Sequence, residues 1–306
     1  KKYINSLNHM RDAWINPEVA QNYLFNYILQ KNSKENEFNT ILFQGDSQTE
    51  GLNFLEKETL EKLFNNKDTI VNAGTTSYSP SLMSVQFDIL VNDFKLRPNI
   101  VIAIIDSTDI GDENCRYKKL TEIENNKIVK VKKVEERGEY YFYENNFLFS
   151  EIYLSKFPKI IYIPKIINHF IKYNLNTVSN CKFDTIQNYL VANNKLDQDY
   201  FKFILETYIN NVSSYDFVKK LYIVSFPHIQ HYDKKYYGIK YNVKTSDLIN
   251  SIELNSKVVH LNFFEDEIFK EYNSDLFKVY LKNDPASHLT KKGKSIFFNK
   301  IMKKIN

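Results

Sequence analysis

Three side chains in two widely separated segments have the types and spacing for nucleophilic chemistry. Ser47 stands in Gly-Asp-Ser-Gln-Thr-Glu-Gly, and Asp284 and His288 stand in Asn-Asp-Pro-Ala-Ser-His near the other end of the chain. A serine hydroxyl needs a base to become a competent nucleophile, and imidazole titrates near neutral pH. A carboxylate would hold the imidazole tautomer and offset its developing charge. Taken singly, Ser47 also suits a helix N-cap and Asp284 a turn. The presence of both segments in one chain favours catalysis.

Five short apolar runs, rich in β-branched residues, are typical of strands in a parallel sheet that is covered on both faces. They are Asn39 to Gly45, Thr69 to Gly74, Asn99 to Ile105, Lys220 to Phe226 and Lys257 to Phe263. Segments with helical apolar spacing separate them: Leu52 to Phe64, Ser81 to Phe94, Gln198 to Ile209 and Lys292 to Ile305. This alternation predicts an α/β fold, a three-layer α/β/α sandwich with a parallel five-stranded sheet. Its strand ends would gather ligand-binding residues at one edge.

Two regions depart from this alternation. Residues 1–38 precede the first strand and predict a helical extension, with a helix from about Pro17 to Leu29. Residues 39–306 then form the main domain, with an insertion over about 116–197. A Lys/Val alternation at its start predicts a β-hairpin or flap after the third strand, and residues 148–197 look mainly helical. The insertion either caps the active edge or is an ordinary surface excursion.

The composition of the chain limits the classes of function that it can have. The 306 residues are 43% hydrophobic and 25% charged, so the chain can bury a full core. The net charge of +4 is spread along the chain, which argues against nucleic-acid binding. No run of about 18 apolar residues exists, so no membrane span is expected. A start at Lys1 suggests a processed or trimmed product, and it leaves open that an export signal or anchor was removed. Cys115 and Cys181 lack metal or redox spacing.

The motifs together resemble those of the SGNH/GDSL hydrolase superfamily. The segment around Ser47 resembles block I, and Val-Asn-Ala-Gly, ending at Gly74, resembles block II. Ile-Asp-Ser-Thr-Asp-Ile, which contains Thr108, falls where block III is expected, and Asp284 and His288 resemble block V. The resemblance runs from Asn39 to the C-terminus apart from the insertion. It implies a Ser47–His288–Asp284 triad.

The same resemblance implies an oxyanion hole built from the Ser47 and Gly74 backbone N–H groups, with Thr108 assisting. Block III departs from the family pattern because Thr108 stands where the family has Asn and Asp106 where it has Gly, while Asp109 matches. Loss of one oxyanion donor costs about 3–4 kcal/mol in the transition state, and a threonine hydroxyl can donate one bond. Asp284 and His288 have three residues between them, where the family has two.

Other polar residues lie at the same predicted sheet edge. His228 and His231 follow the fourth strand, and we expect them, with Asp109, to contact substrate, although a polar loop without function would have the same sequence. Their H-x-x-H spacing lacks an evident third metal ligand. The acidic residues Asp106, Asp109, Asp112 and Glu113 favour structural hydrogen bonds and pocket contacts over a cation site. His169 and His260 lie in helical and strand patterns and are expected to be packed. No metal and no cofactor are expected.

The sequence therefore predicts a serine esterase that removes O-acetyl or other short acyl groups from a carbohydrate through an acyl-enzyme on Ser47. Family analogy suggests an acylated cell-envelope glycan as the partner and a periplasmic or cell-envelope location. One alternative is an O-acetyltransferase that uses the same triad on a glycan. Another is a non-catalytic glycan-binding protein, which the altered block III would fit. The sequence does not specify the acyl group, the glycan or the oligomeric state.

Overall fold

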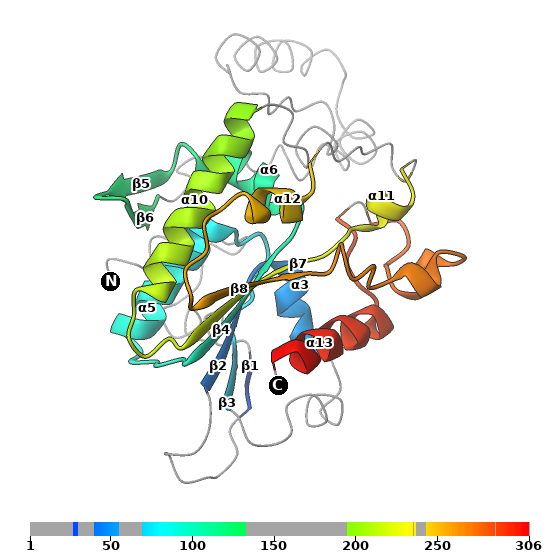
Figure 1. The fold of residues 1–306 in the computed structure, drawn as a ribbon, viewed down its shortest axis with the longest axis horizontal. Helices are drawn as coiled ribbons and strands as arrows, with labels where there is room; N and C mark the ends of the chain where they lie inside the picture. Colours follow the sequence, from blue (N-terminus) through cyan, green and yellow to red (C-terminus); the bar gives the residue numbers. More distant parts are fainter. Residues whose placement is uncertain are drawn as a thin grey trace, which may run out of the picture.

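A six-stranded sheet forms the centre of the molecule (Figure 1). The computed structural model describes residues 27–29, 40–54, 69–132, 195–234, 236, 243–284 and 286–305. The sheet order is β1-β3-β2-β4-β7-β8, in which β1 pairs antiparallel with β3 and the other five strands are parallel. The bounds are β1 Tyr27–Leu29, β2 Thr40–Gln44, β3 Thr69–Asn72, β4 Ile100–Ile105, β7 Lys220–Ser225 and β8 Val258–Asn262.

The five parallel strands confirm the predicted sandwich, and each begins within one residue of its predicted start. Successive side chains of a strand point to opposite faces, so an apolar run without polar breaks must be covered on both sides. In β4, Val101 and Ala103 pack into one core, whereas Ile102 and Ile104 pack into the other. This two-sided burial explains why the strands contain so few polar residues.

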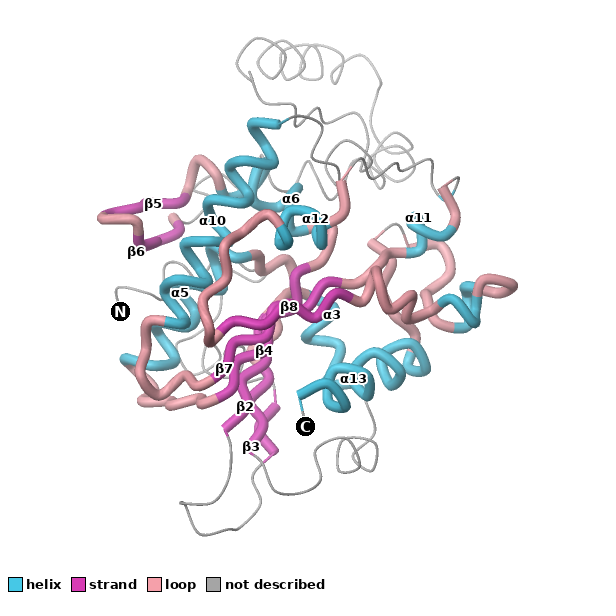
Figure 2. The backbone as a smooth tube through the Cα atoms, in the orientation of Figure 1, coloured by secondary structure: helices cyan, strands magenta, loops and turns pink. Residues whose placement is uncertain are grey.

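Helices form the two outer layers, as Figures 1 and 2 show. On one face lie α5, α10 and α12, with bounds Pro80–Asn92, Lys195–Ser213 and Thr245–Asn250. On the other lie α3 and α13, with bounds Ser47–Glu50 and Lys291–Ile305. Two further short helices, α6 Asp109–Gly111 and α11 Ile229–Tyr232, follow β4 and β7. In the described part of the chain, no helix is long and apolar enough to cross a bilayer.

The described start of the insertion is the predicted hairpin, formed by β5 (Thr121–Glu124) and β6 (Lys127–Val131). Asn125 and Asn126 connect the strands with φ angles of 50° and 57°, which asparagine tolerates better than most residues. The hairpin packs on α5 and α10, and Lys127 pairs with Asp88 of α5 at 3.0 Å. It therefore covers a helix layer. The rest of the insertion, including His169 and Cys181, lies outside the described residues, and Cys115 is disulfide-bonded.

One part of the predicted N-terminal extension is wrong. Residues Tyr27–Leu29 form strand β1 at the edge of the sheet, where a helix ending at Leu29 was expected. Three apolar or aromatic residues in a row suit either element, and the pairing with β3 brings together residues more than 40 positions apart. The remaining residues of the predicted helix lie outside the described residues.

Candidate active site

Ser47 is the first residue of α3, directly after a sharp turn that leaves β2. Gly45 enters this turn with a φ of 149°, a conformation that favours glycine, and a Cβ there would lie 2.1 Å from Thr49 Oγ1. Asp46 caps α3 by accepting a hydrogen bond from the Gln48 N–H at 2.8 Å. The turn leaves Ser47 half-buried at the carboxyl end of the sheet, where its hydroxyl can meet another segment.

The second segment that reaches this point is the loop from Asp284 to Leu289. An antiparallel bridge between Tyr280 and Leu289 closes the loop, and the Leu281 N–H donates to the His288 carbonyl at 2.8 Å. Asp284 accepts the His288 backbone N–H at 2.7 Å and the Ala286 N–H at 3.1 Å. Asp284 therefore organises the loop that carries His288 as well as contacting its ring.

The three side chains form a continuous hydrogen-bonded chain. Ser47 Oγ lies 2.7 Å from His288 Nε2, and His288 Nδ1 lies 2.6 Å from Asp284 Oδ2. A carboxylate only accepts, so Nδ1 carries the proton toward Asp284 and Nε2 can accept the Ser47 proton. The side chains of His288 and Asp284 are 32% and 20% exposed, so this series of hydrogen-bonded side chains is in contact with solvent.

The electrostatics of this pair suit a base near neutral pH. Burial lowers the pKa of His288, but the hydrogen bond and the charge of Asp284 outweigh burial, so the pKa is raised above 6.5. Burial likewise raises the pKa of Asp284, but the bonds and charge of His288 outweigh it and lower the pKa below its usual value. Asp284 thus stays ionised beside a ring that it makes more basic.

The expected oxyanion donors differ in what they contact. The Ser47 N–H donates to no other group in the described part of the chain. Gly74 packs directly on α3, where an added Cβ would lie 2.4 Å from the Glu50 nitrogen, but its N–H donates to Asn72 Oδ1 at 3.0 Å. The hydroxyl and the N–H of Thr108 both donate to Asp106 Oδ1 at 2.6 Å. The Thr108 hydroxyl therefore donates its hydrogen bond to Asp106 in this structure, and its assistance to an oxyanion stays a prediction.

A second Asp–His pair lies beneath the site. Asp106, which follows β4, and His228, which follows β7, are 1% and 0% exposed and lie 3.4 Å apart. Burial raises the pKa of Asp106, but the charge and hydrogen bond of His228 outweigh it and lower the pKa to about 2. Asp109 is also 0% exposed. The side chains of His228 and Asp109 are both buried, which argues against direct contact with substrate, and their substrate contact stays a prediction.

His231 remains at the margin of the site. Its Nδ1 accepts the His228 N–H at 3.0 Å, and its ring meets Phe264 edge-on at a centroid distance of 4.9 Å. Burial, followed by the charge of His228, lowers the pKa of His231 to about 3. Its substrate contact stays a prediction.

Three buried carboxylates, from Asp46, Asp106 and Asp109, offer oxygens within 4.8 Å of one another. Most of these oxygens already accept hydrogen bonds: Asp46 Oδ1 from the Gln48 N–H, Asp109 Oδ2 from the Asp106 N–H, and Asp106 Oδ1 from Thr108. Burial, and then the charge of Asp106, raises the pKa values of Asp46 and Asp109 well above their usual range. Donors of the chain itself thus meet at least one oxygen of each of the three carboxylates.

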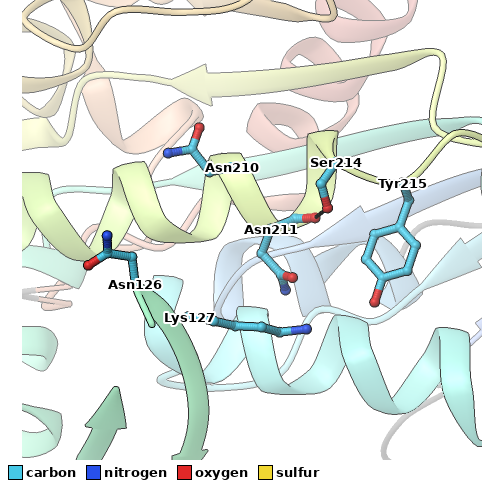
Figure 3. Close-up of a pocket in the computed structure, with 6 residues that line it drawn as sticks. All are labelled: Asn126, Lys127, Asn210, Asn211, Ser214 and Tyr215. Atoms are coloured by element: carbon cyan, nitrogen blue, oxygen red, sulfur yellow. Dashed lines mark hydrogen bonds between the residues drawn. The ribbon is translucent and has the colours of Figure 1, made fainter. Parts of the chain in front are cut away.

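A polar cavity of about 250 Å³ lies on the opposite helix layer, between the hairpin and α10 (Figure 3). It is lined by Asn126, Lys127, Asn210, Asn211, Ser214 and Tyr215. The buried carboxylate of Asp88 takes bonds from Asn211, Tyr215 and Lys127 at 3.0–3.2 Å. None of the triad residues lines this cavity.

Sequence reasoning missed two buried glutamines that contact the His288 loop. Gln48 bonds to the backbone on both sides of His288, and Gln230 accepts the Ser287 hydroxyl at 2.6 Å. Gln48 stands directly after Ser47, and this adjacency was the one signal available. The contacts of Gln230 depend on where α11 lies in the fold.

Comparisons with known proteins do not assign a function to this chain, so a functional assignment depends on the geometry described above. No family model and no curated protein matches the sequence. An alpha/beta hydrolase enzyme, LAE5, from the metagenome of Lake Arreo, Spain, is similar in structure, with a TM-score of 0.46 and 10% identity over 87% of this chain and 94% of that one. A catalytic mutant of Axe2, an acetylxylan esterase from Geobacillus stearothermophilus, gives a TM-score of 0.44 and 11% identity over 88% and 94%. At these scores neither likeness assigns an activity.

Proposed function

We propose that the protein is a serine esterase that removes O-acetyl or other short acyl groups from a carbohydrate. The observation that carries this proposal is the 2.7 Å contact between Ser47 Oγ and His288 Nε2, with Asp284 behind the ring. The resemblance to the SGNH/GDSL motifs supports the same chemistry. A cell-envelope glycan as substrate, and a location there, follow from family analogy and form part of the proposal.

The reaction follows from the order of the three groups. Ser47 Oγ attacks the acyl carbonyl carbon while its proton passes to His288 Nε2, and Asp284 offsets the charge on the ring. The tetrahedral oxyanion lies near the Ser47 N–H, the expected donor that the described chain leaves uncommitted. Its collapse breaks the ester bond, and the leaving sugar oxygen takes the proton from His288. Water, activated by the same ring, then hydrolyses the acyl-Ser47 ester.

The surface around the described residues supports a small acyl group. Among them, three large hydrophobic side chains are substantially exposed: Phe203, Phe277 and Leu281 at 39%, 42% and 45%. Phe203 lies in α10, whereas Phe277 and Leu281 lie in the segment that leads to the His288 loop. Two exposed side chains beside the loop offer a small apolar surface, which suits a short acyl group better than a long one.

The test is acetate release from p-nitrophenyl acetate and from acetylated xylo- and chito-oligosaccharides, with Ser47→Ala as the comparison. The wild type should release acetate, and an acetyl adduct on Ser47 should be trapped by rapid acid quench and mass spectrometry. Equal rates for Ser47→Ala and wild type would overturn the proposal. Adding an unacetylated glycan as acceptor distinguishes the transferase: acetyl transfer in place of acetate release would identify it.

A further inference from the structure

We propose that Gln48 is a positioning residue that holds His288 in register with Ser47. The inference rests on the proposed function, because it concerns the same proton transfer. Gln48 follows the nucleophile in the chain, is 2% exposed, and reaches a loop that lies about 240 residues away in sequence. Gln48 would fix the distance between Ser47 Oγ and His288 Nε2, which neither α3 nor the His288 loop could fix alone.

The Gln48 amide contacts both peptide groups next to His288. Its Nε2 donates to the Ser287 carbonyl at 3.2 Å, and its Oε1 accepts the Leu289 N–H at 3.4 Å. One planar side chain therefore pairs with the backbone before and after the base, much as a neighbouring strand would. Rotation or displacement of this short stretch would break at least one of the two bonds.

The backbone at this point needs such support. Ser287 has a φ of 59°, a left-handed conformation that is unfavourable for a residue with a side chain. Its hydroxyl donates to Gln230 of α11 at 2.6 Å, and the residue is 0% exposed. Gln230 holds the Ser287 side chain, whereas Gln48 holds the carbonyl. Of the two glutamines, only Gln48 also belongs to the helix that carries the nucleophile.

The geometry separates two contributions to the triad. Asp284 and His288 lie in one loop, and their contact does not involve Gln48. Loss of Gln48 should therefore loosen the Ser47–His288 contact and leave the Asp284–His288 contact intact. A misplacement of about 1 Å can cost about 10²-fold in rate. We expect kcat to fall about 10- to 100-fold, with KM and the midpoint of the pH–rate profile unchanged.

The experiment uses Gln48→Met, which keeps the length of the side chain and removes both bonds, and Gln48→Leu, which is shorter, uncharged and also removes both bonds. Kinetics with p-nitrophenyl acetate over a pH series give kcat, KM and the midpoint, and crystal structures of wild type and variants give the Ser47 Oγ–His288 Nε2 distance. Asn211→Leu is the matched control. It also removes a buried amide, one that bonds to Ser84 and Asp88 at 3.1 Å and belongs to α10, on the helix layer opposite α3.

A selective fall in kcat for the Gln48 variants, with wild-type kcat in Asn211→Leu, supports the inference. So does a Ser47–His288 separation beyond hydrogen-bond distance in the variant crystals. Wild-type kcat in folded Gln48→Met, or in Gln48→Leu should Gln48→Met not fold, overturns it. A wild type that hydrolyses no ester defeats the proposed function instead, and the crystal distances then decide the positioning role alone.

Discussion

Two serine–histidine chains run through the described part of the molecule with nearly the same geometry. In the first, Ser47 Oγ lies 2.7 Å from His288, whose other nitrogen lies 2.6 Å from Asp284. In the second, Ser225 Oγ lies 2.8 Å from His260, whose other nitrogen lies 2.8 Å from Asn250. Hydrogen-bond distances alone would therefore nominate both as catalytic.

Charge and exposure separate them. The carboxylate of Asp284 raises the pKa of His288, whereas the neutral amide of Asn250 leaves burial to lower the pKa of His260 to about 4. Ser47 stands half-buried at the start of α3, whereas Ser225, at the end of β7, is 0% exposed. A hydrogen-bonded serine thus becomes a candidate nucleophile only when its histidine is basic enough and its hydroxyl can be reached. The second chain instead joins β7 to β8 and α12.

The largest effect that tests this contrast is the loss of each histidine. His288→Ala should lower kcat for p-nitrophenyl acetate by roughly 10⁴- to 10⁶-fold, because Ser47 loses its base. His260→Ala should keep kcat within a few-fold and instead lower the melting temperature, because the hydrogen bonds to Ser225 and Asn250 are lost. Steady-state kinetics and thermal unfolding of both variants check this. Loss of turnover in His260→Ala at an unchanged melting temperature would erase the distinction.

The third member of each chain gives the next largest effect. Asp284→Asn should lower kcat about 10⁴-fold, as loss of a triad carboxylate does, and should shift the midpoint of any remaining pH–rate profile downward. The reason is that Asp284 supplies the hydrogen bond and charge that raise the pKa of His288. The reciprocal change, Asn250→Asp, should raise the pKa of His260 without creating esterase activity. Activity that survives in Asp284→Asn at the wild-type midpoint would remove Asp284 from the relay.

Titration of the two rings sharpens the comparison without any substrate. NMR of the histidine Cε1–Hε1 groups should place the midpoint of His288 above 6.5 and that of His260 near 4. The variants His288→Gln and His260→Gln assign the signals. Coincident midpoints near 6.5 would mean that the environments do not differ as the structure indicates.

The same shifts have opposite consequences for stability. The stabilisation linked to the raised pKa of His288 is present below about pH 6.5 and is lost as pH rises through its folded-state value. The pKa of His260 is lowered in the folded state, so the unfolded chain binds a proton first as pH falls. The stability that comes from the neutral His260 ring is therefore lost as pH falls from about 6.5 toward 4. Urea unfolding at several pH values should therefore show a shallower acid limb in His260→Gln than in the wild type.

Most of the Ser47–His288–Asp284 series could be predicted from the sequence, whereas little of the Ser225–His260–Asn250 series could. The parallel strands could be predicted because apolar, β-branched runs have few alternatives, and the motifs around Ser47 and His288 could be matched by order. By contrast, the burial of His228 follows from Asp106 at the end of a neighbouring strand, a contact between positions 122 residues apart. Short β1 was likewise misjudged because its pairing, rather than its composition, makes it a strand. Contacts between residues far apart in the sequence therefore determine the features that the motifs could not predict.

The smallest expected effect concerns Thr108, whose type departs from the family pattern. Its hydroxyl donates to Asp106 Oδ1, which also accepts the N–H groups of Thr108 and Asp109 at 2.6 and 3.3 Å. Thr108→Val keeps the shape and removes one bond among three, so we expect a loss of about 1 kcal/mol in unfolding free energy and less than a tenfold change in kcat. A true oxyanion donor would cost about 10²- to 10³-fold in kcat instead. Saturating kinetics and urea unfolding of the one variant measure both quantities. A large fall in kcat at unchanged stability would mean that the hydroxyl leaves Asp106 in the transition state. Thr108 would then act with Ser47 as an oxyanion donor.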